Sequence, residues 1–181
     1  MNKTTEQEIL SMLKEPGSRD MGFKLLMDTY KERIYWYIRR LVVTHEDAED
    51  ILQETFINAF NYAVSFRGNS LLYTWLYRIA TNECIRHFRH EKRKGIKKVE
   101  VSKKLAEELK DFDMESGDAL LLKFQEAILR LPRKQQLVFN MRYYDELSYE
   151  EISQVLNSSV GALKTNYHYA TEKIKEILKN Q

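Results

Sequence analysis

Cysteine, proline and glycine are scarce in this 181-residue chain, which contains one, two and six of them, respectively. The lone Cys84 excludes an internal disulfide. Few helix-breaking residues and no long strand-like alternation together predict an all-α protein. No apolar run approaches the ~18 residues of a membrane-spanning helix, and the first ten residues, MNKTTEQEIL, lack the apolar core of a signal peptide. These absences favour a cytoplasmic protein.

Motifs for common cofactors are lacking as well. The chain contains no P-loop, no glycine-rich dinucleotide turn and no Cys/His spacing typical of zinc sites. A carboxylate-rich helical bundle raises the alternative of a di-metal enzyme, which uses Glu-x-x-His pairs on facing helices. Glu83 and His87 are four residues apart rather than three, so they do not form such a pair. We therefore expect no metal, no cofactor and no catalytic residue.

Charge is strongly segregated although the net charge is only +2. Residues 44–66 contain no Lys or Arg but five acidic side chains, at Glu46, Asp47, Glu49, Asp50 and Glu54. Residues 76–98 are strongly basic, and residues 100–118 are acidic again. Blocks of alternating sign indicate several binding surfaces, although solvated helix faces would give a similar pattern.

Apolar spacings of three and four residues predict helices in two groups. The first group has helices over about 5–14, 23–41, 45–60 and 72–90, with Thr44 as an N-cap and a loop at 66–70. The second has a helix over 119–131, ended by Pro132, and three further helical stretches after it. We predict two small helical domains, an N-terminal helix bundle (1–90) and a C-terminal helix-turn-helix domain (117–181). A charged linker (91–116) joins them, and a short amphipathic helix is expected from Val101 to Phe112 within it.

The stretch SSVGALKTNYHYATEK, residues 158–173, completes a helix-turn-helix pattern. Ser148 and Glu151 match a capping box at the start of a short helix, and Asn157–Ser159 form the turn. The longer helix then has an inward apolar stripe, made by Val160, Leu163, Tyr167, Ala170 and Ile174. Lys164, Thr165, His168 and Tyr169 consequently face outward. The second helix of such a unit enters the DNA major groove, although a solvated face would show the same polarity.

Three stretches resemble a family with this domain order, the extracytoplasmic-function sigma factors of bacterial transcription. DAEDILQETFINAF, residues 47–60, resembles the helix that docks on the clamp coiled coil of RNA polymerase. FRGNSLLYTWLYRIATNECIRHFR, residues 66–89, resembles the part that melts and reads the minus-10 element. LPRKQQLVFNMRYYDELSYEEISQVLNSSVGALKT, residues 131–165, resembles the domain that reads the minus-35 element.

The resemblance implies a site for each function. It assigns polymerase docking to Asp47, Asp50, Gln53 and Glu54. In the family the loop that corresponds to Arg67, Gly68, Asn69 and Ser70 holds a base extruded from the minus-10 element. Single-stranded DNA is commonly bound by stacking aromatics and basic grooves, so Tyr73 is expected to stack on a base and Arg78, Asn82, Arg86 and Arg89 to hold the DNA backbone. Tyr77 is a further candidate for base stacking, whereas Trp75 lies on the apolar stripe and is expected in the core. For minus-35 DNA the expected residues are Arg133, Arg142, Ser159, Lys164, Thr165, Asn166, His168 and Tyr169.

The minus-35 helix departs from the family pattern. Where the family often has GTVKSRLHRAR, this chain has GALKTNYHYAT, which keeps Lys164 but replaces three arginines by Asn166, Tyr169 and Thr171. Fewer cations predict fewer phosphate contacts and a weaker dependence of binding on salt.

The resemblance also implies partners. These are core RNA polymerase, promoter DNA and, as often in this family, an anti-sigma protein associated with the membrane; no direct membrane insertion of this chain is expected. An ordinary helix-turn-helix regulator with an N-terminal sensor domain is the alternative. That alternative would explain the C-terminal residues but not DAEDILQE or the FRGNS segment.

Overall fold

The computed structural model describes residues 3–42, 44–66, 68–93 and 118–180, and every regular element within these ranges is helical. The elements are α1 (Lys3–Lys14), α2 (Arg19–Arg39), α3 (His45–Tyr62), the 3-10 helix η1 (Ala63–Ser65), α4 (Leu72–Arg93), α6 (Asp118–Leu129), α7 (Arg133–Tyr143), α8 (Tyr149–Leu156) and α9 (Val160–Lys179). The predicted all-α class is confirmed. The helix expected from Val101 to Phe112 lies outside the described residues.

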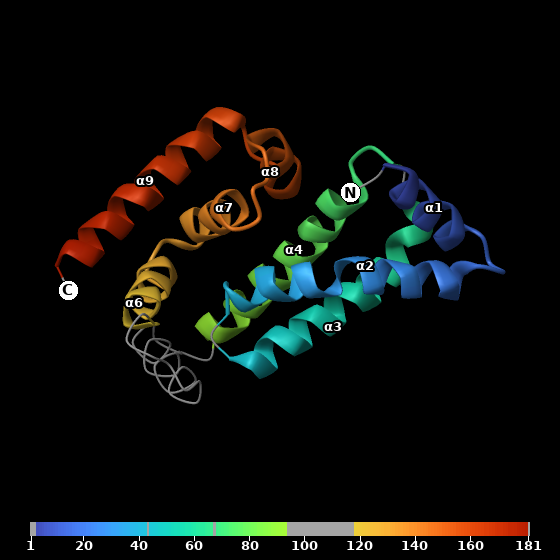
Figure 1. The fold of residues 1–181 in the computed structure, drawn as a ribbon, viewed down its shortest axis with the longest axis horizontal. Coiled ribbons are helices and arrows are strands. Elements are labelled where there is room, and N and C mark those ends of the chain that lie inside the picture. The colour runs from blue at the N-terminus through green and yellow to red at the C-terminus, as the bar shows by residue number, and fades with distance from the viewer. Residues whose placement is uncertain (1–2, 43, 67, 94–117, 181) are drawn as a thin grey trace.

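Helices α1 to α4 form an N-terminal unit in which α2, α3 and α4 pack side by side (Figure 1). The Thr44 hydroxyl caps α3 as predicted, accepting a hydrogen bond of 3.0 Å from the Asp47 amide. The apolar face of α3 is buried at Ala48, Ile51, Leu52, Thr55, Phe56 and Ala59. Burial of this whole stripe leaves the opposite side of α3 in contact with solvent.

The first helix, α1, packs tightly on α2. A methyl group built on Gly22 would lie 2.7 Å from the Met12 Cβ and 2.9 Å from the Leu13 amide nitrogen, so only glycine allows this approach. On the same helix, one carboxylate oxygen of Glu6 accepts a bond of 2.9 Å from the Tyr30 hydroxyl. The other oxygen accepts a bond of 3.3 Å from the Leu72 amide at the start of α4. Glu6 thus ties α1 to both α2 and α4.

The C-terminal unit contains the predicted helix-turn-helix. Ser148 and Glu151 form a complete capping box at the start of α8. Asn157 ends α8 in the left-handed conformation, with φ 46°, which asparagine adopts more readily than most residues. The Ser159 hydroxyl accepts a hydrogen bond of 3.3 Å from the Ala162 amide and caps α9. Local capping chemistry therefore fixes where both helices begin and where the turn between them lies.

The two units also pack against each other. α8 lies against α4, whereas α9 lies on the side of its unit away from α4 (Figure 1). Buried side chains of α7 and α8, among them Val138, Met141, Ile152 and Val155, join the apolar cluster of the N-terminal unit. A second, smaller cluster joins α6, α7 and α9. Direct contact between the units was not predicted from the sequence, which indicated only two separate apolar patterns.

No helix in the part of the chain that the structure describes is both long and apolar enough to cross a bilayer.

Candidate nucleic-acid and polymerase interfaces

The outer side of α3 carries the predicted polymerase-docking residues. Asp50, Gln53 and Glu54 are all exposed, opposite the buried stripe of the same helix. Glu46 and Glu49 are exposed on the first turns, so the surface is acidic over the first half of the helix. A row of exposed carboxylates suits a basic partner, which it would attract before contact is made.

Asp47 is positioned differently from the other three. Its side chain is half-buried, and its Oδ2 accepts a bond of 2.6 Å from the Thr44 hydroxyl. Its Oδ1 lies 3.9 Å from Nδ1 of His87 on α4, and the other ring nitrogen of His87 lies 3.7 Å from Glu91. The Glu91 carboxylate beside the ring raises the pKa of His87, although burial opposes this effect. Asp47 therefore serves the junction of α3 with α4 as well as the acidic surface.

Arg86 lies where the acidic face of α3 meets the basic face of α4. Its guanidinium is 2.6 Å from Glu83 Oε2 and 3.4 Å from Glu54 Oε2. The other predicted minus-10 cations of α4, Arg78 and Arg89, are exposed, as is Asn82. These positions are spaced by three or four residues and share one side of the helix. Arg86 thus links the acidic surface of α3 to the basic surface of α4, which the sequence analysis considered separately.

The loop before α4 borders a pocket of about 530 Å³. Its lining includes the predicted Asn69, Ser70 and Arg78 and also residues that the sequence analysis missed; the full set is Tyr62, Ser65, Phe66, Asn69, Ser70, Trp75, Arg78 and Gln154. Gly68 has φ 74°, a conformation that glycine adopts without strain. Arg67 lies outside the described residues. A pocket with an amide, a hydroxyl, a guanidinium and aromatic rings has the groups needed to hold an unstacked base.

The aromatic side chains near this pocket are partly rearranged from the prediction. Tyr77 is fully buried, with its ring centre 4.8 Å from that of Tyr37, so the structure contradicts its suggested role in base stacking. Trp75 is in the core, as expected, and packs on Phe66 at 4.9 Å. Tyr73 is half-buried, with the Arg33 guanidinium 5.5 Å from its ring centre. Tyr62, 56% exposed, is the aromatic residue at the pocket that remains open to a ligand.

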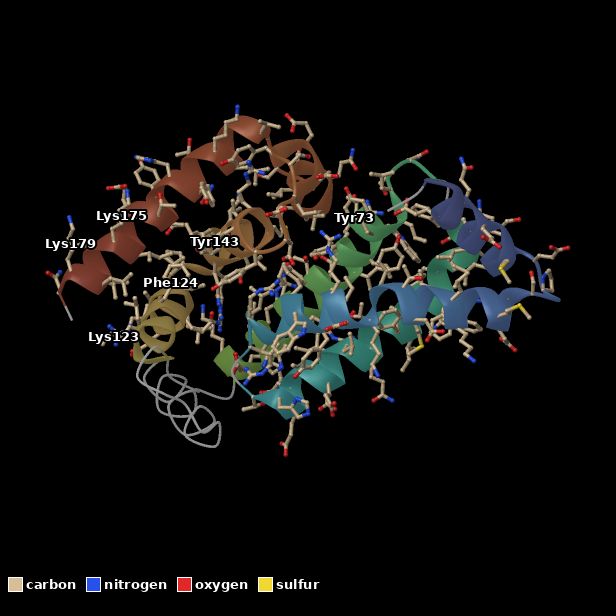
Figure 2. All side chains as sticks on the ribbon, viewed as in Figure 1. Tyr73, Lys123, Phe124, Tyr143, Lys175 and Lys179 are labelled. Carbon is tan, nitrogen blue, oxygen red and sulfur yellow. The ribbon has the colours of Figure 1, made fainter. Side chains whose placement is uncertain are left out.

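The outward face of α9 is as predicted. Lys164, Thr165, His168 and Tyr169 are exposed, and Leu163, Ala170 and Ile174 are buried. Asn166 is half-buried and donates a hydrogen bond of 2.7 Å to the Ala162 carbonyl. Figure 2 shows Lys175 and Lys179 on the same outer side of the unit, away from α4. The helix therefore offers an exposed polar face, on which Lys175 pairs with Glu172 at 2.8 Å.

The two arginines of α7 have different surroundings. Arg142 donates a bond of 3.1 Å to the Leu147 carbonyl, and its guanidinium lies 5.3 Å from the Tyr149 ring centre. Arg133 turns toward the N-terminal unit, where it stacks over Phe88 at 3.6 Å and lies 3.5 Å from Glu91. Arg142 therefore makes its contacts within its own unit, whereas Arg133 is engaged between the units. No cluster of three or more metal-binding side chains occurs among the described residues.

Comparison with known proteins matches both units to one family. Residues 26–94 match the family described as Sigma-70 region 2, and residues 121–174 match Sigma-70, region 4. The chain is similar to the ECF RNA polymerase sigma factor SigW of Bacillus subtilis (strain 168). The two are 36% identical over 173 residues, covering 91% of this chain and 92% of that protein.

Two solved structures share the fold. One is that of CnrH in complex with the cytosolic domain of CnrY, with a TM-score of 0.73 and 17% identity, covering 98% of this chain and 99% of the other. The second is that of the sigma factor RpoE in complex with the anti-sigma factor NepR from Bartonella quintana. Its TM-score is 0.68 and its identity 23%, and the match covers 87% of this chain and 96% of the other.

Proposed function

Since the chain belongs to the extracytoplasmic-function family of RNA polymerase sigma factors, we propose that three surfaces on its two units divide promoter recognition between them. A sigma factor is not an enzyme; it binds core RNA polymerase and directs the polymerase to promoters. The first domain, residues 1–90, binds polymerase and the minus-10 element. The second, residues 117–181, reads the minus-35 element, and residues 91–116 connect the two.

Polymerase docking falls to the outer side of α3, through Asp47, Asp50, Gln53 and Glu54. The observation that carries this assignment is the exposure of Asp50, Gln53 and Glu54 opposite a wholly buried stripe. Exposed carboxylates contribute little to the stability of a fold, so a protein partner is a better account of their grouping. Because the Asp47 carboxylate also accepts a hydrogen bond from Thr44, the N-cap of α3, its substitution would change stability as well as docking.

The nontemplate strand of the minus-10 element binds at the loop of residues 66–70 and along the exposed side of α4. Asn69, Ser70 and Arg78 line the pocket, and Tyr62 adds an exposed ring at its edge. Gly68 shapes the loop beside them, and Tyr73 packs at the start of α4. Asn82, Arg86 and Arg89 continue the same side of the helix, where a nontemplate backbone would run. Arg67 is proposed here from the family resemblance alone.

The minus-35 duplex is read by α9 in the major groove. Lys164, Thr165, His168 and Tyr169 face outward, and Asn166 lies at the edge of that face. Ser159 caps the helix at the Ala162 amide, and the remaining free amides of the first turn would bind a phosphate. Arg142 contributes a phosphate contact from α7. Arg133 would join it only after leaving Phe88 and Glu91.

Regulation by an anti-sigma protein associated with the membrane is proposed by analogy with the family. RpoE of Bartonella quintana, which shares this fold, was solved with the anti-sigma factor NepR. We place the site of action in the cytoplasm, where RNA polymerase and promoter DNA are found.

The docking surface is tested by a double variant, Asp50→Lys with Gln53→Lys. We expect a large loss of affinity for core RNA polymerase, measured by fluorescence anisotropy, with an unchanged circular dichroism spectrum. The matched control, Asp28→Lys with Gln7→Lys, changes the same residue types at exposed positions of α2 and α1 and should bind normally. Equal affinity of the two variants would refute the assignment of α3. If the unmodified protein did not bind polymerase at all, the alternative of an ordinary helix-turn-helix regulator would be favoured instead.

A further inference from the structure

A nearly buried carboxylate, that of Glu83 on α4, belongs to none of the proposed binding surfaces. Its side chain is 11% exposed, and one oxygen, Oε1, accepts a hydrogen bond of 2.9 Å from the side-chain amide of Asn58 on α3. The other oxygen, Oε2, lies 2.6 Å from Nη2 of Arg86, which is three residues further along α4. A carboxylate buried to this degree needs such partners, because burial removes most of its hydration. Glu83 therefore ties a predicted DNA-binding cation to the helix proposed for polymerase docking.

The same nitrogen of Arg86 is also close to the proposed docking surface. Nη2 of Arg86 lies 3.4 Å from Oε2 of Glu54 on α3, and the two side chains are 64% and 50% exposed, respectively. Glu54 and Asn58 are four residues apart, so they share one side of α3. The contacts from Glu54 through Arg86 and Glu83 to Asn58 thus form a chain that begins and ends on the docking helix.

Two carboxylates share one guanidinium in this chain of contacts, so local negative charge exceeds the positive charge of Arg86. A DNA phosphate that approaches Arg86 must compete with both anions, which also repel it. Basic side chains of a docked polymerase would act in the opposite direction, because they would attract Glu54 away from the guanidinium. Glu54 is half exposed and can turn toward such a partner, whereas Glu83 is nearly buried and held by Asn58. Glu54 is thus the exchangeable partner of Arg86, and Glu83 is the fixed one.

We propose that Glu83 sets the strength of the minus-10 contact made by Arg86, and that Glu54 couples this contact to polymerase docking. In the free protein both carboxylates compete with a DNA phosphate for the guanidinium. When polymerase engages Glu54, one competitor is removed, and the nontemplate backbone then competes with Glu83 alone. This inference rests on the proposed assignment of α3 to polymerase and of α4 to minus-10 DNA.

The coupling has a definite sign and size. Core polymerase and minus-10 DNA bind with positive cooperativity, and each raises the affinity of the other by the same factor. Exposed ion pairs change affinity by roughly twofold to fivefold, so we expect a factor in this range from the pair of Glu54 with Arg86.

The first test measures polymerase affinity without DNA. Arg86→Ala removes the cation that competes for Glu54, so fluorescence anisotropy should show roughly twofold to fivefold tighter binding to core RNA polymerase. Arg93→Ala removes the same charge from an exposed position at the end of α4 and should not produce this gain. The gain should also vanish when Glu54→Gln is already present, because the pair is then lost.

Two results of the first test would overturn the coupling in different ways. If Arg86→Ala gives no gain over Arg93→Ala, or the same gain with and without Glu54→Gln, Arg86 does not restrain Glu54. If Glu54→Gln alone leaves polymerase affinity unchanged, the docking assignment of Glu54 is wrong, and the coupling fails with it.

The second test measures the minus-10 contact in the holoenzyme, where Glu54 is engaged. The probe is a fluorescein-labelled single-stranded oligonucleotide selected from a random pool by the unmodified holoenzyme. Holoenzyme with Glu83→Gln should bind it roughly twofold to fivefold more tightly, because glutamine can still accept the Asn58 bond but has no charge. Glu8→Gln, the same change at an exposed position of α1, is the matched control. The gain should be absent when Arg86→Ala is also present.

The role of Glu83 would be overturned by a gain that persists without Arg86. It would also be overturned if Glu83→Gln gave no gain over Glu8→Gln while Arg86→Ala weakened oligonucleotide binding. If Arg86→Ala left oligonucleotide binding unchanged, Arg86 would not contact the minus-10 strand. In that case the minus-10 assignment of Arg86 would be wrong, and the proposal would fall with it.

Discussion

At the scale of single residues, Tyr149 is notable because two proposed DNA-binding cations lie near one ring. The Arg142 guanidinium is 5.3 Å and the Lys164 ammonium 5.7 Å from its centre, the first from α7 and the second from α9. The Tyr149 ring also meets Tyr167 edge to face at 6.4 Å. Cations within about 6 Å of an aromatic face are attracted to it. Tyr149 is therefore expected to position both cations before DNA binds.

Substitution of Tyr149 should show how much DNA affinity depends on the positions of Arg142 and Lys164, because it leaves both charges in place. We expect Tyr149→Leu to weaken binding of a minus-35 duplex by roughly twofold to fivefold, because about 0.5–1 kcal/mol of cation–π attraction is lost. The salt dependence should stay the same since both cations remain. Lys164→Ala should instead lower the salt slope by about one if Lys164 contacts phosphate. Anisotropy titrations over a salt series measure both quantities. Tyr149→Phe keeps the ring and should bind normally; a loss equal to that of Tyr149→Leu would contradict the prediction.

At the scale of helices, the close packing of α1 on α2 depends on Gly22. Alanine normally stabilises a helix relative to glycine by about 1 kcal/mol. Here the added methyl group would meet Met12 Cβ and the backbone of Leu13, both within 3 Å. Gly22→Ala should therefore lower the free energy of unfolding by about 1–3 kcal/mol.

Urea denaturation measures this change, and Gly161 of α9 provides the control. A methyl group at Gly161 would have no neighbour within 4 Å, so Gly161→Ala should be neutral or slightly stabilising. Equal stability of the Gly22→Ala variant and the unmodified protein would show that α1 can move away from α2 at little cost.

The junction of α3 with α4 should make stability depend on pH through His87. The nearby Glu91 carboxylate raises the pKa of His87 above its ordinary value, and Asp47 acts in the same direction, whereas burial and Arg133 oppose it. Protonated His87 is thus favoured in the folded protein. Its contribution is fully present below about pH 6.5, the unfolded pKa, and disappears as the pH rises through the higher folded value.

We expect the unmodified protein to lose stability toward urea between pH 6 and pH 9, and His87→Gln to lose less over the same range. His90→Gln, an exposed histidine on the same helix, serves as the control and should follow the unmodified protein. A His87→Gln variant with the full pH dependence would assign the effect to another group.

Helix starts and turns could be predicted from the sequence because their causes are local. Thr44, Ser148 and Ser159 each accept a hydrogen bond from the amide three residues ahead, and Asn157 needs only its own backbone conformation.

The burial of Tyr77 could not be predicted from local sequence. α4 packs against α2, α3 and α8, so it is buried around most of its circumference, and a single apolar stripe underestimates its buried face. Tyr77 lies on the part of α4 that one stripe does not include.

At the scale of the whole molecule, the packing of α7 and α8 against the N-terminal unit could not be predicted, because it joins residues far apart in sequence. Periodicity shows which side of a helix is buried, but not which distant element covers it. In the sequence, Asp145 looks like any polar residue in the loop after a helix. In the structure its side chain is buried and lies 2.7 Å from the Arg40 guanidinium. Arg133 likewise fits a phosphate contact by sequence, whereas in the structure it lies against Phe88.

Because α7 and α8 pack against α4, we expect the two units to stay together after the linker is cut. A specific protease site placed after Glu100 would divide the chain into two pieces under native conditions. We expect both pieces to elute together in size-exclusion chromatography, because the apolar contacts of α7 and α8 with α4 do not depend on the linker. The same cut in Asp145→Arg should release them. Separate elution of the pieces from the unmodified protein would mean that the linker alone keeps the units together.

The hydrogen bond from the Leu72 amide to Glu6 makes one backbone proton a reporter for the N-terminal segment. α1 precedes residue 26, where the match to Sigma-70 region 2 begins, yet its Glu6 carboxylate protects the first amide of α4, beside the loop that we propose for minus-10 DNA. Hydrogen exchange at Leu72 therefore records whether α1 is docked. A tag or truncation at the N-terminus that shortens the exchange lifetime of this proton would also loosen the loop, at a distance of some 66 residues along the chain.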